Sequence, residues 1–296
     1  MNKKIIAIIA IVALVGVLAV GLSACDNKDN TGNSILFGKE LLALTSQMDT
    51  LTQLNNGGAD IAVMDSVMAG YYTSRGDFAG KMVVIEDLVL SEEQYGIATK
   101  KGSESFMSKI NEALIALNAN GQLTEIGETY GLANENLISA STSNPYADAT
   151  DNSWNQIVND GVVNIGYTEF APIAYYENNV FKGYDIDLAK AVFAYLNSTY
   201  GTDIKVNFVL IEWNQKENLI KNGSIDLIWN GMTITDKLAA NMTVSVPYLA
   251  NKQACVVLKA DEEKYNTIAK FIKNSKTAIV AVENGSAAYK ILTMEI

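Results

Sequence analysis

Histidine is absent from this 296-residue sequence, and cysteine occurs only twice, at Cys25 and Cys255. Histidine is the commonest general base and a common zinc ligand, so its absence argues against a hydrolase or a metal site. Cys255 lies within the apolar run 254–258. We therefore interpret Cys255 as a small buried hydrophobic residue and not as a nucleophile.

Basic residues are also scarce, because 22 Lys and Arg stand against 33 Asp and Glu, which gives a net charge of −11. Nucleic-acid binding requires a basic surface, so this charge argues against nucleic acid as a partner. The roughly 270 residues that follow Cys25 suffice for one large or two medium domains.

The first 25 residues have the pattern of an export signal. Lys3 and Lys4 precede an apolar run over residues 5–21, and Leu-Ser-Ala-Cys follows at 22–25. A basic start, an apolar core and small residues at the exit are typical of a secretory signal peptide. The alternative is a plain transmembrane anchor, since the run approaches the roughly 20 residues needed to span a bilayer. Either interpretation places the rest of the chain outside the membrane.

Residues 22–25 resemble the lipobox of bacterial lipoproteins, in which the cysteine becomes the lipidated first residue. This resemblance implies a lipid anchor at Cys25 on the extracytoplasmic face of the cell membrane. Cys255 would then be the only remaining thiol, and no internal disulfide could form.

Two polar stretches divide the mature chain. Residues 26–34 indicate a tether, and residues 133–153, rich in Ser, Thr, Asn and Asp, indicate a flexible linker. The two folded segments are then 35–132 and 154–296.

Both segments alternate apolar strands with amphipathic helices. We expect strands at 61–64, 162–165, 225–229 and 277–282, and a helix whose apolar stripe runs from Phe106 and ends at Gly121. Asp185 is expected to cap another helix. This alternation predicts an α/β fold with a mainly parallel sheet.

One pattern occurs in both segments. Residues 56–60 read Asn-Gly-Gly-Ala-Asp and lead into the strand at 61–64, while residues 222–226 read Asn-Gly-Ser-Ile-Asp and lead into the strand at 227–229. Each is a helix end, a glycine turn, an aspartate and a buried strand. The repetition suggests two lobes of similar construction.

The second segment resembles the first half of the type II periplasmic binding proteins for amino acids. The stretches that carry this resemblance are 166–172 (GYTEFAP), 183–189 (GYDIDLA), 230–236 (NGMTITD), 245–248 (SVPY) and 284–286 (NGS). The first segment resembles the second half of the same family, through 58–65 (GADIAVMD), 95–98 (YGIA) and 110–121.

The two halves stand in reversed order, so we interpret the chain as a circular permutant of one binding protein. Segment 133–153 would then join the former termini. The competing interpretation is a tandem gene truncated at both ends. The resemblance implies a two-lobed α/β fold, with one lobe from 153–255 and 99–132 and the other from 262–296 and 35–92. The chain would cross between them near 90–98 and 251–261.

The family closes its two lobes on a ligand, and hinge closure is the motion that this implies. Carried over by position, the resemblance places Phe170 and Trp213 as aromatic walls of an interlobe cleft. It places the Gly231 backbone and the Thr233 hydroxyl as hydrogen-bonding groups. For both aromatic residues the alternative is ordinary core packing.

The remaining expected ligand contacts are Ser286, Asp65 and Tyr167. Ser286 starts a helix, where a hydroxyl can bind an anion or cap the helix. Asp65 matches the family position whose carboxylate takes the ligand ammonium, and it could also cap the helix that follows. Tyr167 occupies a position where many members carry aspartate.

One departure concerns the ligand carboxylate. The family carries arginine three residues after its Thr-x-Thr motif, and this position is Leu238 here. A planar guanidinium holds a carboxylate with two parallel bonds, which the neighbouring Lys237 does not replace. The ligand therefore either binds weakly or lacks a free carboxylate.

The resemblance implies a monomeric substrate-binding lipoprotein of an amino-acid ABC transporter, with a small amino-acid-like ligand and an ABC permease as partners. We expect no cofactor and no enzymatic activity, although some relatives of this fold are dehydratases. The alternatives are a sensor module that presents its closed form to a receptor, or a non-functional remnant.

Overall fold

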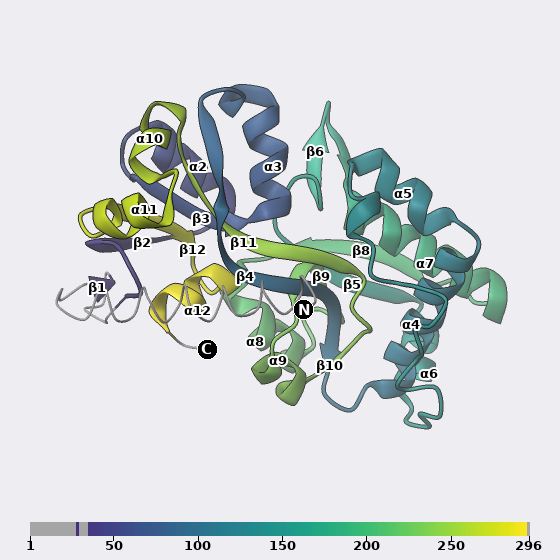
Figure 1. The fold of residues 1–296 in the computed structure, drawn as a ribbon. Coiled ribbons are helices and arrows are strands. Elements are labelled where there is room, and N and C mark those ends of the chain that lie inside the picture. The colour runs from purple at the N-terminus through teal and green to yellow at the C-terminus, as the bar shows by residue number, and fades with distance from the viewer. Residues whose placement is uncertain (1–27, 30–34, 295–296) are drawn as a thin grey trace, which may run out of the picture. The chain divides into compact units, whose positions relative to one another are not determined.

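The computed structural model describes residues 28–29 and 35–294, and these residues form two compact units (Figure 1). Unit 1 runs up to Glu92 and resumes at Lys252, and unit 2 runs from Glu93 to Asn251. The chain therefore passes between the units at 92–93 and at 251–252. The predicted signal peptide, Cys25 and most of the predicted tether lie outside the described residues.

Unit 1 combines segments from both ends of the described chain, coloured purple to blue and yellow in Figure 1. Its strands are β1 (Lys28–Asp29), β2 (Glu40–Leu44), β3 (Ile61–Asp65) and β12 (Ile279–Glu283). Its helices are α2 (Gln47–Asn55), α3 (Ser66–Ser74), α10 (Glu262–Tyr265), α11 (Ile268–Ser275) and α12 (Ala287–Thr293), with 3-10 turns at Gly76–Phe78 and Lys259–Asp261.

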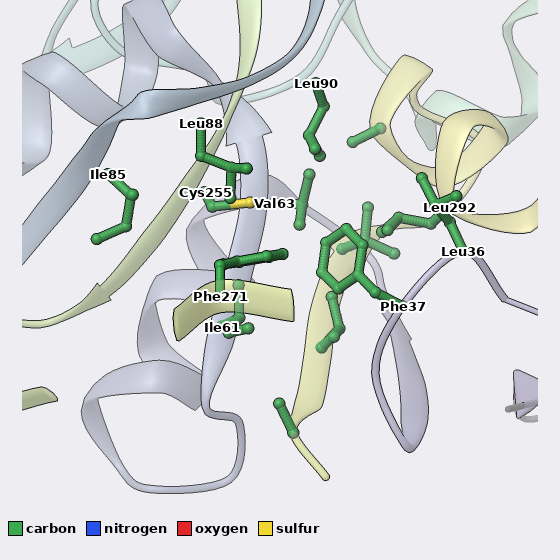
Figure 2. Close-up of a cluster of buried hydrophobic side chains, with 14 of the residues drawn as sticks. Leu36, Phe37, Ile61, Val63, Ile85, Leu88, Leu90, Cys255, Phe271 and Leu292 are labelled. Atoms are coloured by element: carbon green, nitrogen blue, oxygen red, sulfur yellow. The ribbon is translucent and has the colours of Figure 1, made fainter. Parts of the chain in front are cut away.

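Strand β12 lies at the centre of the unit 1 sheet, paired in parallel with β2 on one side and β3 on the other. Strand β1 pairs in parallel with β2. Early and late residues share one apolar core, in which Phe37 packs edge-on against Phe271 with ring centroids 5.0 Å apart (Figure 2). The Leu36 amide donates to the Leu292 carbonyl at 2.7 Å, so the two described ends of the chain meet in this unit.

Unit 2 contains strands β5 (Val162–Tyr167), β6 (Tyr175–Glu177), β7 (Val180–Lys182), β8 (Lys205–Leu210), β9 (Leu227–Thr233) and β10 (Met242–Val244). Its helices are α4 (Glu104–Ala119), α5 (Gln122–Tyr130), α6 (Ser153–Asp160), α7 (Tyr184–Tyr200), α8 (Lys216–Asn222) and α9 (Asp236–Asn241), with 3-10 turns at Ala133–Glu135 and Trp213–Gln215.

The unit 2 sheet has the same parallel arrangement, with β5 between β8 and β9. Helices α4, α5, α6 and α7 pack as one group, whereas α8 and α9 lie apart from them (Figure 1). Phe106 on α4 contacts both Phe193 on α7 and Trp154 on α6 through its ring.

Two long strands carry the chain across the unit boundary. Strand β4 (Met82–Lys100) pairs antiparallel with β9 and β10 inside unit 2, and β11 (Leu249–Leu258) pairs antiparallel with β3 inside unit 1. The predicted α/β class is therefore confirmed. The strand pairing is mixed, because the parallel pairs within each unit are joined by antiparallel pairs of β4 and β11.

The repeated Asn-Gly-x-x-Asp pattern has the same structure in both units. Gly57 and Gly223 adopt φ values of +75° and +76°, the left-handed conformation that favours glycine after a helix. The aspartate that follows then bonds to the next parallel strand in both directions. The Asp226 amide donates to the Asn164 carbonyl at 2.8 Å, and the Asn164 amide donates to the Asp226 carboxylate at 2.8 Å.

Asp60 makes the matching pair with Ile279, at 2.9 and 2.8 Å. We call this two-way contact the aspartate clamp. It links β9 to β5 in unit 2 and β3 to β12 in unit 1, and it fixes the register of each pair at the start of β9 and β3.

Two local predictions are wrong. The cap of α7 is Gly183 and not Asp185, because Asp185 lies in the first helical turn with its carboxylate buried. Segment 133–153 is not a free linker, since both of its ends belong to unit 2 and it is bonded there. The Leu137 amide donates to the Tyr248 carbonyl, and the Asp151 carboxylate accepts the Ser105 amide at the start of α4.

Removal of an aspartate clamp should destabilise the fold. We expect Asp226→Ala to lower the free energy of unfolding by about 1–3 kcal/mol, because the half-buried carboxylate accepts both the backbone amide and the side-chain amide of Asn164. Asp60→Ala should have a smaller effect, since Asp60 is exposed. Denaturant unfolding measures both, with the exposed Asp203→Ala as control. Equal stability of Asp226→Ala and Asp203→Ala would contradict the role of the clamp.

Candidate functional site

The predicted ligand residues of unit 2 all follow the carboxyl ends of its parallel strands. Tyr167 ends β5 and Phe170 comes three residues later. Trp213 follows the end of β8 by the same interval, and Gly231 and Thr233 close β9. Ligands of open α/β sheets bind outside these strand ends, which makes this edge the candidate site of unit 2.

Phe170 packs directly onto Gly231. A methyl group at Gly231 would lie 2.6 Å from the Phe170 ring, and the Gly231 backbone has φ +59°. The Phe170 ring also meets Tyr95 of β4 edge-on, with centroids 6.5 Å apart. Glycine is thus required at 231 by a close aromatic contact within the protein, in addition to any approach of a ligand.

Asp185 lies behind this aromatic contact, fully buried in α7. Its carboxylate accepts the Gly231 amide at 2.7 Å and the Tyr248 hydroxyl at 2.8 Å. Burial raises the pKa of Asp185 to about 7, although the bonds from Tyr248 and Gly231 act in the opposite direction. The Gly231 amide, which the sequence suggested as a ligand contact, is therefore bonded to Asp185.

The Thr233 hydroxyl donates to Glu93 of β4, at 2.8 Å to Oε2. The Asn251 side-chain amide donates to the same Glu93 oxygen at 3.1 Å. A carboxylate thus lies beside the hydroxyl that the resemblance assigns to the carboxylate of a ligand.

Trp213 is 8% exposed and belongs to the apolar core formed with Ile220, Ile228 and Met232. The ammonium of the buried Lys216 lies 4.5 Å from the Trp213 ring centroid and donates to the Trp213 carbonyl at 3.1 Å. Core packing, the alternative for this residue, therefore accounts for much of its surface.

Tyr167 belongs to a separate aromatic cluster with Phe181 and Phe208, at centroid distances of 4.6 and 6.4 Å. Burial, with a smaller contribution from a hydrogen bond to Tyr176, raises the pKa of Tyr167 to about 12. The hydroxyl therefore stays protonated at neutral pH.

Leu238, at the position where the family carries arginine, is 3% exposed and packs in the same core as Trp213. Lys237 is exposed on α9. The local structure at position 238 is thus built for an apolar side chain.

In unit 1 the predicted residues also follow strand ends, since Asp65 ends β3 and Ser286 comes three residues after β12. The Asp65 carboxylate accepts hydrogen bonds from the side-chain amides of Gln47 and Gln253, the latter at 2.9 Å. The Gln47 carbonyl oxygen in turn accepts the Asp65 backbone amide at 3.1 Å. Asp65 is 5% exposed and occupies the N-cap position of α3.

Ser286 is the N-cap of α12, and its hydroxyl accepts the Tyr289 amide at 3.1 Å. The capping role considered for this residue is confirmed. Cys255 is fully buried beside Val63 in β3, and burial raises the pKa of its thiol well above the usual range, as expected for a packing residue.

The structure thus brings Phe170, Gly231 and Thr233 to one edge of unit 2, and it places Tyr167 and Trp213 in neighbouring apolar clusters. In unit 1, Asp65 and Ser286 each belong to a hydrogen-bonded network of their own. Residues 28–29 and 35–294 contain no group of three acidic or Cys side chains able to hold a metal ion. No helix among these residues is both long and apolar enough to cross a bilayer.

Sequence reasoning missed the residues that hold the predicted ones in place: Glu93, Gln47, Gln253 and Lys216. Glu93 and Asn251 are 158 residues apart, so no local pattern could connect them. The burial of Asp185 could have been predicted from the sequence, because helical spacing puts it on one face with the apolar residues Leu188, Ala189 and Val192, which are buried.

Residues 163–290 match the model of the bacterial extracellular solute-binding proteins, family 3. The chain is 29% identical over 128 residues to the probable amino-acid-binding protein YxeM of Bacillus subtilis, and the match covers 43% of this chain and 44% of that protein. It is 33% identical over 78 residues to the virulence sensor protein BvgS of Bordetella pertussis, covering 26% and 6%.

A solved structure of an ABC uptake transporter substrate-binding protein from Streptococcus pneumoniae, with bound histidine, is 35% identical. The match covers 31% of this chain and 36% of that chain, with a TM-score of 0.27. The chain thus spans less than half the length of each of these three relatives. The family match lies within the segment that carries β5 to α12.

The buried carboxylate of Asp185 predicts a specific pH dependence of stability. Its pKa is about 7 in the folded chain and near 4 when unfolded, so the folded state holds the proton more tightly. The free energy of unfolding should fall as pH rises from about 4 to about 7, at up to about 1.4 kcal/mol per pH unit. Asp185→Asn should lose this slope.

Denaturant unfolding at several pH values measures the effect, and the exposed Asp160→Asn serves as control. Identical pH profiles of Asp185→Asn and the unmodified chain would contradict the assignment.

Proposed function

We propose that this chain is a lipid-anchored, extracytoplasmic substrate-binding protein that delivers a small amino-acid-like ligand to an ABC permease. The observation that carries the proposal is that both units place their candidate ligand residues at the same edge of their parallel strands. Each unit presents its candidate residues at the carboxyl ends of parallel strands, and each sets those strands with an aspartate clamp. The family match over 163–290 and the similarity to YxeM support the same function.

We further propose that the ligand is held by both edges in a cleft. Phe170, Trp213, Gly231, Thr233 and Tyr167 would serve from unit 2, and Asp65 and Ser286 from unit 1. Asp65 would take a ligand ammonium, because it is a buried carboxylate and a charge-assisted bond to an ammonium is stronger than a neutral one. Binding without turnover is the expected outcome, as no histidine is available for acid–base chemistry.

The circular permutation is part of this proposal, and the order of elements within each unit supports it. Unit 2 runs β5, α7, β8, α8 and β9, with β5 in the middle of its sheet. In unit 1 the middle strand is β12, which follows β2, α2 and β3 in the chain. In unit 1, α12 corresponds to α7 and β2 corresponds to β8. The α7–β8 connection of unit 2 is therefore matched in unit 1 by the place where Leu292 contacts Leu36.

Sensing is a second candidate, supported by the similarity to BvgS over 78 residues. In that case the closed form would contact a receptor and not a permease. Purification from membranes, followed by identification of the copurifying membrane protein, distinguishes the two functions.

Mass spectrometry of the small molecules that copurify with the mature chain tests the binding function, and titration calorimetry then gives the affinity. Asp65→Asn should weaken binding of an amine-bearing ligand by about tenfold or more, roughly 1.4 kcal/mol. The Asp65 side chain makes no capping hydrogen bond to α3, so α3 should persist in this variant.

The matched control is Asp77→Asn, an exposed carboxylate of the same unit, which should bind as the unmodified chain does. If Asp65→Asn also binds with unchanged affinity, Asp65 has a structural role only.

A further inference from the structure

Strand β1 joins the start of the described chain to unit 1. Residues 28–29 fall within the predicted tether, yet they pair in parallel with Glu40 and Leu41 of β2 (Figure 1). Cys25 precedes Lys28 by three residues, and an extended chain spans at most about 11 Å over that length. A lipid group at Cys25 would therefore hold unit 1 close to the bilayer.

The direction of the strands decides which face of unit 1 lies at the anchor. Strands β1, β2, β12 and β3 are all parallel, so their amino ends share one edge of the sheet, which we call the amino edge. The chain enters β1 from this edge. The candidate ligand residues Asp65 and Ser286 follow the carboxyl ends, at the opposite edge. A strand of 5 residues such as β2 or β12 spans about 17 Å, which is further than the anchor can reach from β1.

Three lysines lie at the amino edge. Lys39 directly precedes β2, and its backbone amide donates to the Ala278 carbonyl at 2.7 Å. Lys276 lies two residues before Ala278, and Lys273 belongs to the last turn of α11, which leads into β12. Lys39 and Lys273 are exposed, whereas Lys276 is half-buried. Basic side chains thus gather where the anchor joins the unit.

Two carboxylates share the amino edge with these lysines. Glu40 begins β2, and Asp60 precedes β3 and accepts the Ile279 amide as part of the aspartate clamp. A lysine in the last turn of a helix also suits the helix dipole, so Lys273 alone indicates no partner. Lys39 belongs to no helix, and its position has no such local explanation.

The two units differ in charge. The described residues of unit 1 contain 11 Lys and Arg against 13 Asp and Glu, a net charge of −2. Unit 2 contains 9 against 18, a net charge of −9. Anionic phospholipids attract basic side chains near their surface, and acidic side chains are repelled there. Unit 1 is therefore the unit whose charge suits contact with a phospholipid surface.

From the attachment at β1 and the lysines beside it, we infer that the amino edge of unit 1 is a membrane-docking face. It lies on the headgroups of the bilayer that holds the lipid anchor, where Lys39, Lys273 and Lys276 contact headgroup phosphates. The ligand residues of unit 1 then point away from the bilayer. The inference rests on the lipid anchor of the proposed function and names the face by which the anchored unit meets the membrane.

The test compares the two ends of β12 in the lipidated mature chain. Thr277→Cys and Asn284→Cys each introduce a thiol at an exposed position, one before and one after this strand. Cys255 is fully buried, so a small fluorophore attaches to the introduced thiol.

Each labelled chain is inserted into vesicles of phosphatidylcholine and phosphatidylglycerol that contain a lipid with a nitroxide on its headgroup, which quenches nearby fluorophores. The two labels lie about 20 Å apart along the strand, so quenching at 277 should exceed quenching at 284 by about twofold or more.

Lys39→Glu should reduce the quenching at 277 by about half, because a repulsion from the headgroups replaces an attraction. The matched control is Lys221→Glu, which changes an exposed lysine of unit 2 and should leave the quenching unchanged.

Equal quenching at the two positions, or stronger quenching at 284, would overturn the inference and leave the anchor standing. Quenching at 277 that Lys39→Glu does not change would overturn docking through the lysines. If mass spectrometry of the mature chain finds no acyl groups at Cys25, the lipid anchor fails and this inference fails with it. The ligand titrations decide the binding function independently.

Discussion

The aspartate clamp is the contact on which the arrangement of each unit depends. Asp226 and Asp60 each exchange two hydrogen bonds with the backbone of the neighbouring parallel strand, at 2.8–2.9 Å. A shift of one residue in a strand would turn every side chain to the opposite face. By setting the register where β9 and β3 begin, the clamp determines which side chains emerge where those strands end.

The residues at the ends of β9 and β3 are held in place by contacts with buried side chains. In unit 2, Asp185 bonds to the Gly231 amide, and Gly231 in turn supports the Phe170 ring. In unit 1, the Gln47 and Gln253 amides surround Asp65. A carboxylate taken out of water requires such donors, and a buried network of this kind holds its members in one geometry. Both edges are therefore preorganised.

Much of the fold could be predicted from the sequence, because its signals are local. The glycine turns before Asp60 and Asp226 predicted two units of similar construction. The apolar runs predicted β3, β5, β9 and β12 to within a few residues. The segment 133–153 was misjudged because its polar composition is that of a linker, whereas its side chains bond to α4.

The site was harder to predict, because its partners come from distant parts of the chain. Glu93 and Thr233 are separated by 140 residues, and Gln253 and Asp65 by 188. A resemblance identifies positions such as Thr233, but it does not say which protein group already occupies them. At position 238 the sequence showed that the arginine is absent. It did not show that the leucine in its place is buried in the core.

The central proposal is that this chain is a circularly permuted binding protein, in which both ends of the described chain complete one unit. Its most direct test is the unfolding transition of a reordered full chain, in which a short linker joins Met294 to Ile35 and the chain opens within 139–143. The account predicts one cooperative transition and the ligand affinity of the original order, because Leu36 and Leu292 are already in contact. A reordered chain that remains soluble but shows no cooperative transition would contradict it.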